Sequence, residues 1–116
     1  MRRTQALGRS GEDLAVDHLL AQGYTILDRN WRCSQGELDI VARDGATTVV
    51  VEVKTRSSSG FGHPLDAITP VKLARLRRLA AAWCEAHGGV DRLRVDAVSV
   101  LADRDGVAID HVRQVC

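Results

Sequence analysis

The chain has 116 residues, 45% of them hydrophobic and 27% charged, which is the balance of a folded globular protein and excludes a disordered chain. That length fits one domain, so we take residues 1–116 as a single unit. The formal net charge of +1 indicates, by itself, neither a nucleic-acid nor a membrane partner. The distribution of the charges along the chain has to decide that question.

Cysteines and apolar runs exclude further classes of protein. The three cysteines are scattered and form no CxxC pair, so neither a zinc knuckle nor a disulfide framework is indicated. Arg2 and Arg3 are followed by no apolar run of signal-peptide length. No stretch approaches the roughly 18 consecutive apolar residues of a membrane span. We therefore expect a cytoplasmic protein with reduced thiols and no membrane partner.

Apolar residues recur at helical spacing over 4–21, which predicts a first helix that Gly23 ends. Three β-rich segments follow and predict strands over 24–28, 38–43 and 47–56. Asp44-Gly45, between the last two, is a strong hairpin turn signal. The first half of the chain is therefore expected to be a helix followed by three strands, the last two paired as a hairpin.

The second half begins with a loop rich in serine, glycine and proline over 57–64. Thr69 is an N-cap with Pro70 at the first helical position, and apolar residues keep helical spacing from there to His87. Two further strands are predicted over 93–102 and 107–112. The order α-β-β-β-α-β-β indicates an α/β or α+β fold in which helices cover a mixed sheet.

Three charged side chains interrupt the apolar strands. Because side chains alternate between the two faces of a strand, Glu52 and Lys54 share one face, and the hairpin turn allows Asp39 to lie beside Glu52. Asp39 itself is expected on the face of its strand opposite Leu38 and Ile40. Two carboxylates and an ammonium would then lie close together in the middle of a sheet.

This grouping has two interpretations. A solvated sheet face can carry a Glu–Lys pair, and the E-x-K spacing alone carries no weight. However, Val49, Val50 and Val51 precede Glu52 without alternation, which indicates a central strand covered on both sides. Because burying an unpaired charge costs free energy, acids on such a strand indicate a ligand that neutralises them.

Glu12 supplies a third acid. It extends the apolar stripe of the first helix back by one turn, so that the core-facing row reads Glu12, Ala15, Val16, Leu19 and Leu20. The alternative is that Glu12 favours the positive N-terminal end of the helix. Three convergent carboxylates beside a lysine would suit Mg²⁺, which prefers oxygen ligands and keeps several waters. Such a cation can activate water for an in-line phosphoryl displacement, with the lysine orienting that water or neutralising charge.

Several segments together resemble the YraN-like family of small bacterial proteins. They are GEDLA, the run from GYTILDRNWR through GELDIVARDG, VVVEVKTR, FGHPLDAITPVKLARLRRLA and RVDAVSV, which cover most of the chain between 8 and 100. The fold of that family is similar to that of archaeal Holliday-junction resolvases and of restriction-endonuclease-like nucleases with the PD-(D/E)xK signature. The resemblance implies a restriction-endonuclease-like core.

The resemblance also implies roles for individual residues. Asp39 matches the first acid of the signature, Glu52 and Lys54 match its ExK half, and Glu12 matches an acid that resolvase-like members carry on the first helix. Leu38 stands where the signature has proline. Asp39, Glu52 and the carbonyl of Val53 would hold Mg²⁺ or Mn²⁺, which Glu12 completes directly or through water.

The implied reaction is hydrolysis of phosphodiester bonds, in branched or structured DNA rather than RNA, during recombination or repair. Symmetric cutting of a four-way junction would require a homodimer, and no sequence feature identifies its surface. The alternative is a non-catalytic module that binds nucleic acid or protein and retains the nuclease fold.

Basic residues flank each segment of the proposed site, as phosphate contacts require. The candidates are Arg9, Arg29, Arg32, Arg56, Lys72 and Arg75. The alternative is that some of these arginines and lysines belong to ordinary solvated helix faces. Aromatic residues make up only 3% of the chain, so recognition by backbone and shape is expected rather than base stacking.

For the remaining polar and aromatic residues we expect structural roles, or leave two alternatives open. His63 could lie near the site, because its loop follows the strand that carries Glu52. Glu37 could touch the metal shell or pair with an arginine, and Asp96 is expected to be a buried acid bonded to backbone. Surface or helix-end positions are expected for His18, His87 and His111, and core positions for Trp31 and Trp83.

Overall fold

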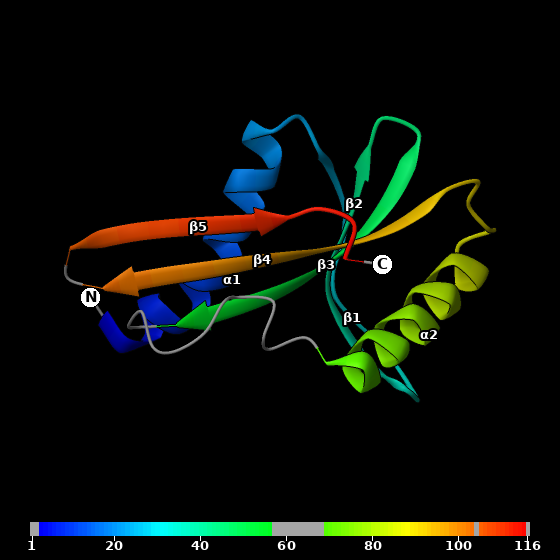
Figure 1. Ribbon diagram of the computed structural model, residues 1–116, viewed down its shortest axis with the longest axis horizontal. Helices are drawn as coiled ribbons and strands as arrows, with labels where there is room; N and C mark the ends of the chain where they lie inside the picture. The colour runs from blue at the N-terminus through cyan, green and yellow to red at the C-terminus, as the bar shows by residue number, and fades with distance from the viewer. Residues whose placement is uncertain (1–2, 57–68, 104, 116) are drawn as a thin grey trace.

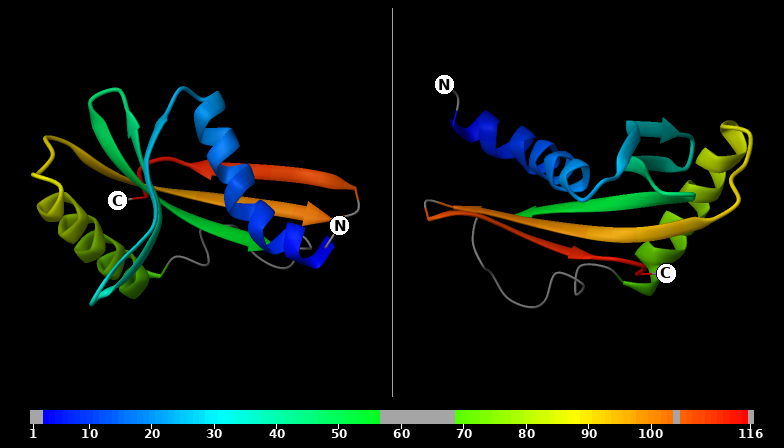
Figure 2. Two further views of the ribbon diagram at one scale, coloured as in Figure 1. Left: turned by 180° about the vertical axis from the view of Figure 1, so that it is seen from behind. Right: turned by 90° about the horizontal axis from the view of Figure 1, so that it is seen from above.

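The computed structural model describes residues 3–56, 69–103 and 105–115, with the backbone alone for 3–10 and for Asp103. One helix lies on each face of a five-stranded sheet (Figures 1 and 2). The elements are α1 (Arg3–Ala21), β1 (Thr25–Cys33), β2 (Gly36–Asp44), β3 (Thr47–Arg56), α2 (Pro70–Ala86), β4 (Leu93–Asp103) and β5 (Gly106–Val112). This order and the mixed sheet confirm the predicted fold class. No described helix is long and apolar enough to cross a bilayer.

The strands lie in the sheet in chain order, and all neighbours are antiparallel except β3 and β4. Parallel neighbours need a crossover connection, which here contains α2. The predicted loop over 57–64, including His63, lies outside the described residues.

Local sequence explains where α2 begins and ends. The Oγ1 atom of Thr69 accepts the backbone N–H of Lys72 at 3.2 Å, and Pro70 occupies the first helical position, as predicted. His87 is the C-cap, and Gly88 follows with a φ of 85°. The predicted helix-end position of His87 is therefore confirmed.

β1 is longer than predicted, because it continues past Asp28 to Cys33. The run Asp28–Arg32 is mostly polar and has little strand periodicity. It pairs along one side with β2, as far as Cys33 opposite Gly36, and lies at an edge of the sheet. Edge strands tolerate charged side chains, which hides them from a search for apolar alternation.

The core has two layers, one under each helix. Val49 and Val51 pack toward α1, while Val50 packs toward α2, and all three are fully buried. β3 is thus a central strand covered on both sides, as predicted. Trp83 is buried in the α2 layer, and Trp31 packs against that layer. Cys33 and Cys84 are free thiols.

The expectation that Leu38 and Ile40 line one face of their strand is wrong. Leu38 packs in the layer under α2, whereas Ile40 packs in the layer under α1. The strand therefore rotates at Asp39, between them. Strand twist is favourable in itself, and here it coincides with the end of the pairing between β2 and β3.

Gly11 allows α1 to approach β3 closely. A Cβ atom at this buried position would lie 2.7 Å from Cγ2 and 2.9 Å from Cβ of Thr55, closer than real Cβ contacts. Because Gly11 precedes Glu12 on α1, this close approach brings the helix turn that carries Glu12 to the strand that carries Glu52 and Lys54.

We expect Gly11→Ala to destabilise the protein. Alanine gains up to about 1 kcal/mol of helix propensity, but overpacking costs about 1–3 kcal/mol, so the expected net loss is on the order of 1 kcal/mol in urea denaturation. The double variant with Thr55→Ala should recover part of the loss, because Oγ1 and Cγ2 are removed. A Gly11→Ala protein as stable as wild type would contradict the close approach.

Candidate active site

The two central antiparallel strands separate at the acids. β2 pairs with β3 only as far as Ile40 opposite Val51. Beyond that point β2 stays with β1, and β3 stays with β4 as far as Arg56 opposite Leu101 (Figure 1). The next residues along the two diverging strands are Asp39 and Glu52. We call these two side chains with the backbone of Val53 the strand fork.

Asp39 replaces the missing strand partner. Its Oδ2 atom accepts the backbone N–H of Val53 at 2.9 Å, which satisfies a donor that the departure of β2 leaves without a ladder bond. In a strand, the N–H and C=O of one residue point toward the same neighbour. The Val53 carbonyl is therefore directed to the same side of β3 as the Asp39 carboxylate.

The carboxyl groups of Asp39 and Glu52 are half-buried and close enough for each to change the pKa of the other. Burial is the largest cause that raises the pKa of Glu52, to about 7, and the charge and hydrogen bond of Asp39 add to it. Arg75 and Lys72 of α2 oppose this rise in the pKa of Glu52. At neutral pH the pair therefore retains a proton for a large fraction of the time.

The pKa of Asp39 is also raised, chiefly by burial. The Val53 N–H lowers it, whereas the negative charges of Glu12 and Glu37 raise it further. Glu12 on α1 is thus close enough to Asp39 to influence its ionisation. Two desolvated acids share the strand fork, with cations on α2 and a third acid on α1.

The donor set of the strand fork fits Mg²⁺ or Mn²⁺. Two carboxylates and one carbonyl supply hard oxygen ligands, and Mg²⁺ in proteins takes one or two carboxylates and retains several waters. Among the residues that the structure describes, no three His, Cys, Asp or Glu side chains are grouped so that they could hold a metal ion.

Glu12 and Lys54 differ in their surroundings. The Glu12 carboxylate accepts hydrogen bonds from Arg29 and Asn30 of β1. Lys54 is exposed two residues beyond Glu52, and within the described residues it makes no hydrogen bond or ion pair. Its ammonium can therefore reach a bound molecule without breaking an existing contact.

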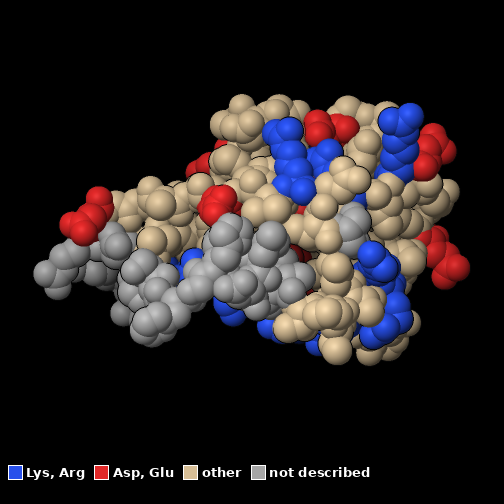
Figure 3. All heavy atoms as spheres, viewed as in Figure 1, with Lys and Arg blue, Asp and Glu red and all other residues tan. Residues whose placement is uncertain are grey.

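Two of the predicted phosphate-binding residues lie on the α2 side of the strand fork. Lys72 and Arg75 belong to the first turns of α2 and lower the pKa of Glu52, so their charges act on the fork. Figure 3 shows lysine and arginine side chains over the exposed side of α2.

The other predicted phosphate contacts have different environments. Arg29 forms ion pairs with Glu12 and Asp13, and Arg32 is 79% exposed and pairs with Glu37 at 3.4 Å. The Nε atom of Arg56 is buried, and it has no hydrogen-bond partner among the residues that the structure describes. Arg9 is part of α1, but its side chain is outside the described atoms.

A second buried polar cluster was largely missed by the sequence. Asp96 is fully buried, accepts the backbone N–H of Gln114 as predicted, and also accepts Nε of Arg94 at 2.8 Å. His111 Nε2 lies 2.8 Å from Asp96, and His111 Nδ1 lies 3.0 Å from His18 Nε2. His18 lies in the last turn of α1, which confirms its predicted helix-end position. His111 lies in β5 with a side chain that is only 7% exposed, so the surface or helix-end position expected for it is wrong.

The sequence marks only one member of that cluster, because Asp96 interrupts an apolar strand. Arg94 lies two residues before Asp96 on β4, but Tyr24, just before β1, and His111 on β5 are far from it in the sequence and follow no spacing rule. Cationic and neutral donors, led by His111 and Arg94, outweigh burial and lower the pKa of Asp96 to about 2. With its charge neutralised inside the protein, Asp96 has a structural role.

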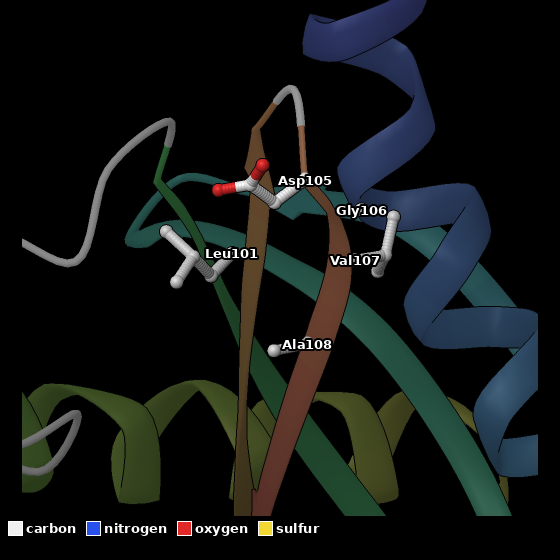
Figure 4. A pocket seen from close by; sticks show the side chains of 5 residues that line it. All are labelled: Leu101, Asp105, Gly106, Val107 and Ala108. Atoms are coloured by element: carbon white, nitrogen blue, oxygen red, sulfur yellow. The ribbon is translucent and has the colours of Figure 1, made fainter.

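A shallow pocket lies at the turn between β4 and β5 (Figure 4). The side chains of Leu101 and Val107 point to opposite sides of this turn, and among the described lining residues only Asp105 is titratable. We assign no chemistry to it.

Residues 11–100 match the sequence profile of "Uncharacterised protein family UPF0102". Proteins named UPF0102 protein are similar over nearly their whole length. One from Clavibacter michiganensis is 51% identical over all of both chains, and one from Paenarthrobacter aurescens is 53% identical over all of this chain and 98% of its own. A third, from Beutenbergia cavernae, is 55% identical over 99% of each chain.

The chain belongs to the UPF0102 family. This confirms the YraN-like resemblance seen in the sequence. The part that matches the UPF0102 profile contains all four residues proposed for catalysis, Glu12, Asp39, Glu52 and Lys54.

We expect Glu52→Gln to stabilise the protein at alkaline pH. The folded pKa of Glu52, about 7, exceeds its usual value of 4.5, so its contribution to stability is complete below pH 4.5 and is lost as the pH rises through 7. The variant should exceed wild type by about 1–3 kcal/mol at pH 8 and match it near pH 5. Urea denaturation across this range measures the difference, with the exposed Glu85→Gln as control. Equal pH profiles for Glu52→Gln and wild type would contradict the raised pKa.

We expect Asp96→Asn to destabilise the protein by about 2–4 kcal/mol at pH 7, because Arg94 and His111 lose their buried anion. The pKa of Asp96 is lowered from 3.8 to about 2, so its stabilisation is present above pH 4 and disappears as the pH falls toward 2. The difference in the free energy of unfolding between variant and wild type should therefore decrease as the pH falls from 4 toward 2. Asp91→Asn, an exposed change, is the control, and a variant as stable as wild type would refute the structural role.

Proposed function

We propose that this protein is a metal-dependent nuclease that hydrolyses phosphodiester bonds. The observation that carries the proposal is the strand fork, where Asp39 accepts the Val53 N–H and lies beside Glu52, and where burial and mutual repulsion raise the pKa of Glu52. A purely structural acid pair would be neutralised by protein cations, as Asp96 is. Here the pKa values are raised, which is the pattern of a functional site awaiting a positive ligand.

In the proposed reaction the carboxylates of Asp39 and Glu52 and the carbonyl of Val53 would hold Mg²⁺ or Mn²⁺. When bound, that cation would supply positive charge at the phosphate and lower the pKa of a water. The Lys54 ammonium donates a hydrogen bond that orients the attacking water or neutralises charge on the phosphoryl oxygens. The water oxygen would form a new bond to phosphorus and release a proton to solvent, while the bond to the leaving sugar oxygen breaks and that oxygen takes up a proton from solvent.

The proposed substrate is DNA, with branched or structured forms favoured, and the proposed setting is recombination or repair in the cytoplasm. Lys72 and Arg75 support phosphate binding, because their charges already act on Glu52 from α2. The low aromatic content supports recognition of backbone and shape. Symmetric cutting of a junction would be done by a homodimer.

The second candidate is a non-catalytic module that binds nucleic acid or protein. Two observations favour it. The net charge is only +1, and Arg29, one of the expected phosphate contacts, is engaged by Glu12 and Asp13. A module of this kind would bind without cleaving and would not need the acids of the strand fork.

Cleavage assays separate these candidates. The protein is incubated with single-stranded, duplex, flap and four-way-junction DNA and with matched RNA, in Mg²⁺, Mn²⁺ or EDTA. We expect metal-dependent cleavage that falls by at least about 100-fold in Glu52→Ala and in Lys54→Ala. Glu85→Ala, an exposed acid near the other end of α2, should cleave as wild type does.

Cleavage that persists unchanged in both Glu52→Ala and Lys54→Ala would contradict the mechanism. Binding to DNA without cleavage of any substrate in either metal would instead favour the module.

A further inference from the structure

Asn30 of β1 lies at the level of the strand fork. β1 pairs with β2 through Arg29 opposite Ile40 and Trp31 opposite Leu38. Asn30 is between the two, so it stands opposite Asp39 across the strand pair. Adjacent strands therefore carry Asn30, Asp39 and Glu52 at neighbouring positions of the sheet.

Asn30 and Arg29 hold the carboxylate of Glu12 from both sides. The Nδ2 atom of Asn30 donates to Oε2 at 2.9 Å. Arg29 donates to Oε1 from Nη2 at 2.7 Å and from Nε at 3.2 Å. Arg29 Nη2 also reaches Asp13 at 2.8 Å, which ties the arginine to the same turn of α1.

The backbone of Asn30 is unusual for a strand residue, with a φ of 53°. Most side chains disfavour this left-handed conformation, and asparagine is among the few that adopt it readily. Asn30 thus combines this left-handed backbone with a side-chain hydrogen bond to Glu12. The role proposed below accounts for both.

We propose that Asn30 and Arg29 are positioning residues that fix the Glu12 carboxylate beside the cation of the strand fork. This inference rests on the proposed function. The inference changes the role expected for Arg29, because its guanidinium binds Glu12 and Asp13 instead of a phosphate.

The geometry also decides how Glu12 acts. A carboxylate offers about four acceptor sites, and Arg29 and Asn30 together occupy three of them. The remaining acceptor site of Glu12 suits a hydrogen bond from a water bound to the cation better than a direct bond to the cation. Glu12 therefore acts through water, and its negative charge, which already influences Asp39, strengthens binding of a cation.

A merely structural alternative is that these bonds only attach β1 to α1. Both alternatives predict some loss of stability on mutation, so stability cannot separate them. They differ for cation affinity, since groups that orient metal-site residues change it by about 10–100-fold when removed.

The test measures Mn²⁺ affinity by calorimetry in folded protein without DNA. Asn30→Gly keeps the left-handed backbone and removes the amide, whereas Asn30→Asp keeps the shape and replaces the donor by a repelling charge. We expect Asn30→Gly to bind Mn²⁺ about 10-fold more weakly than wild type, and Asn30→Asp to lose at least as much affinity. Arg29→Gln should be similarly weakened, and Arg43→Gln, an exposed arginine on the neighbouring strand β2, is the control and should bind as wild type.

Two metal-free measurements accompany the calorimetry. The ¹⁵N resonances of Arg29 Nε and Asn30 Nδ2 should shift in Glu12→Gln if the three side chains are bonded. Arg29→Gln should bind labelled junction DNA in EDTA as wild type does. A loss of DNA affinity together with a salt dependence lowered by about one unit would identify Arg29 as a phosphate contact and overturn its proposed role.

The outcomes separate the two levels of the proposal. If Mn²⁺ binding is lost in Glu52→Gln but unchanged in Asn30→Gly, the proposed function stands and the positioning role is overturned. Resonances that do not move in Glu12→Gln would overturn the bonded arrangement itself. If the wild-type protein binds no Mn²⁺, the proposed function fails and the positioning role fails with it.

Discussion

The bond from the Val53 N–H to Asp39 is the contact on which the site depends. Where β2 turns away from β3, the central strand loses a ladder partner, and a side-chain carboxylate takes its place. That single replacement has three consequences. It allows β2 to rotate, so that Leu38 and Ile40 enter different core layers. It holds Asp39 beside Glu52, and it places the Asp39 carboxylate on the side of β3 to which the Val53 carbonyl is directed.

The protein contains two buried acidic centres with opposite electrostatics. Asp96 is fully buried, yet Arg94, His111 and a backbone N–H keep it ionised, with its pKa lowered to about 2. Glu52 is less buried, yet its pKa rises to about 7, because its neighbour is another acid and the α2 cations only partly compensate. The difference is in the partners rather than in the degree of burial. One centre is complete within the protein, and the other has unsatisfied negative charge.

The two helices contribute to the strand fork in different ways. α1 approaches β3 closely at Gly11 and presents Glu12, whose carboxylate is held by β1. α2 presents Lys72 and Arg75, whose charges act on Glu52. The Glu12 carboxylate thus lies on the α1 face of the sheet, and the cations Lys72 and Arg75 lie on the α2 face. Such a division allows a cation and a phosphate to approach one point from different sides, which suits the proposed reaction.

The sequence by itself determined the order of elements, the buried valine strand, the α2 cap and the candidates Asp39, Glu52, Lys54 and Glu12, because these depend on local periodicity, turn residues and resemblance. Three features depended on the tertiary structure. The polar part of β1 is a strand only because β2 pairs with it, and His18, His111 and Asp96 come together only because α1 and β5 meet beside β4. The position of Asn30 beside Glu12 likewise arises from strand register and a left-handed backbone. Contacts between residues far apart in the chain follow no spacing in the sequence, so only the folded arrangement could decide them.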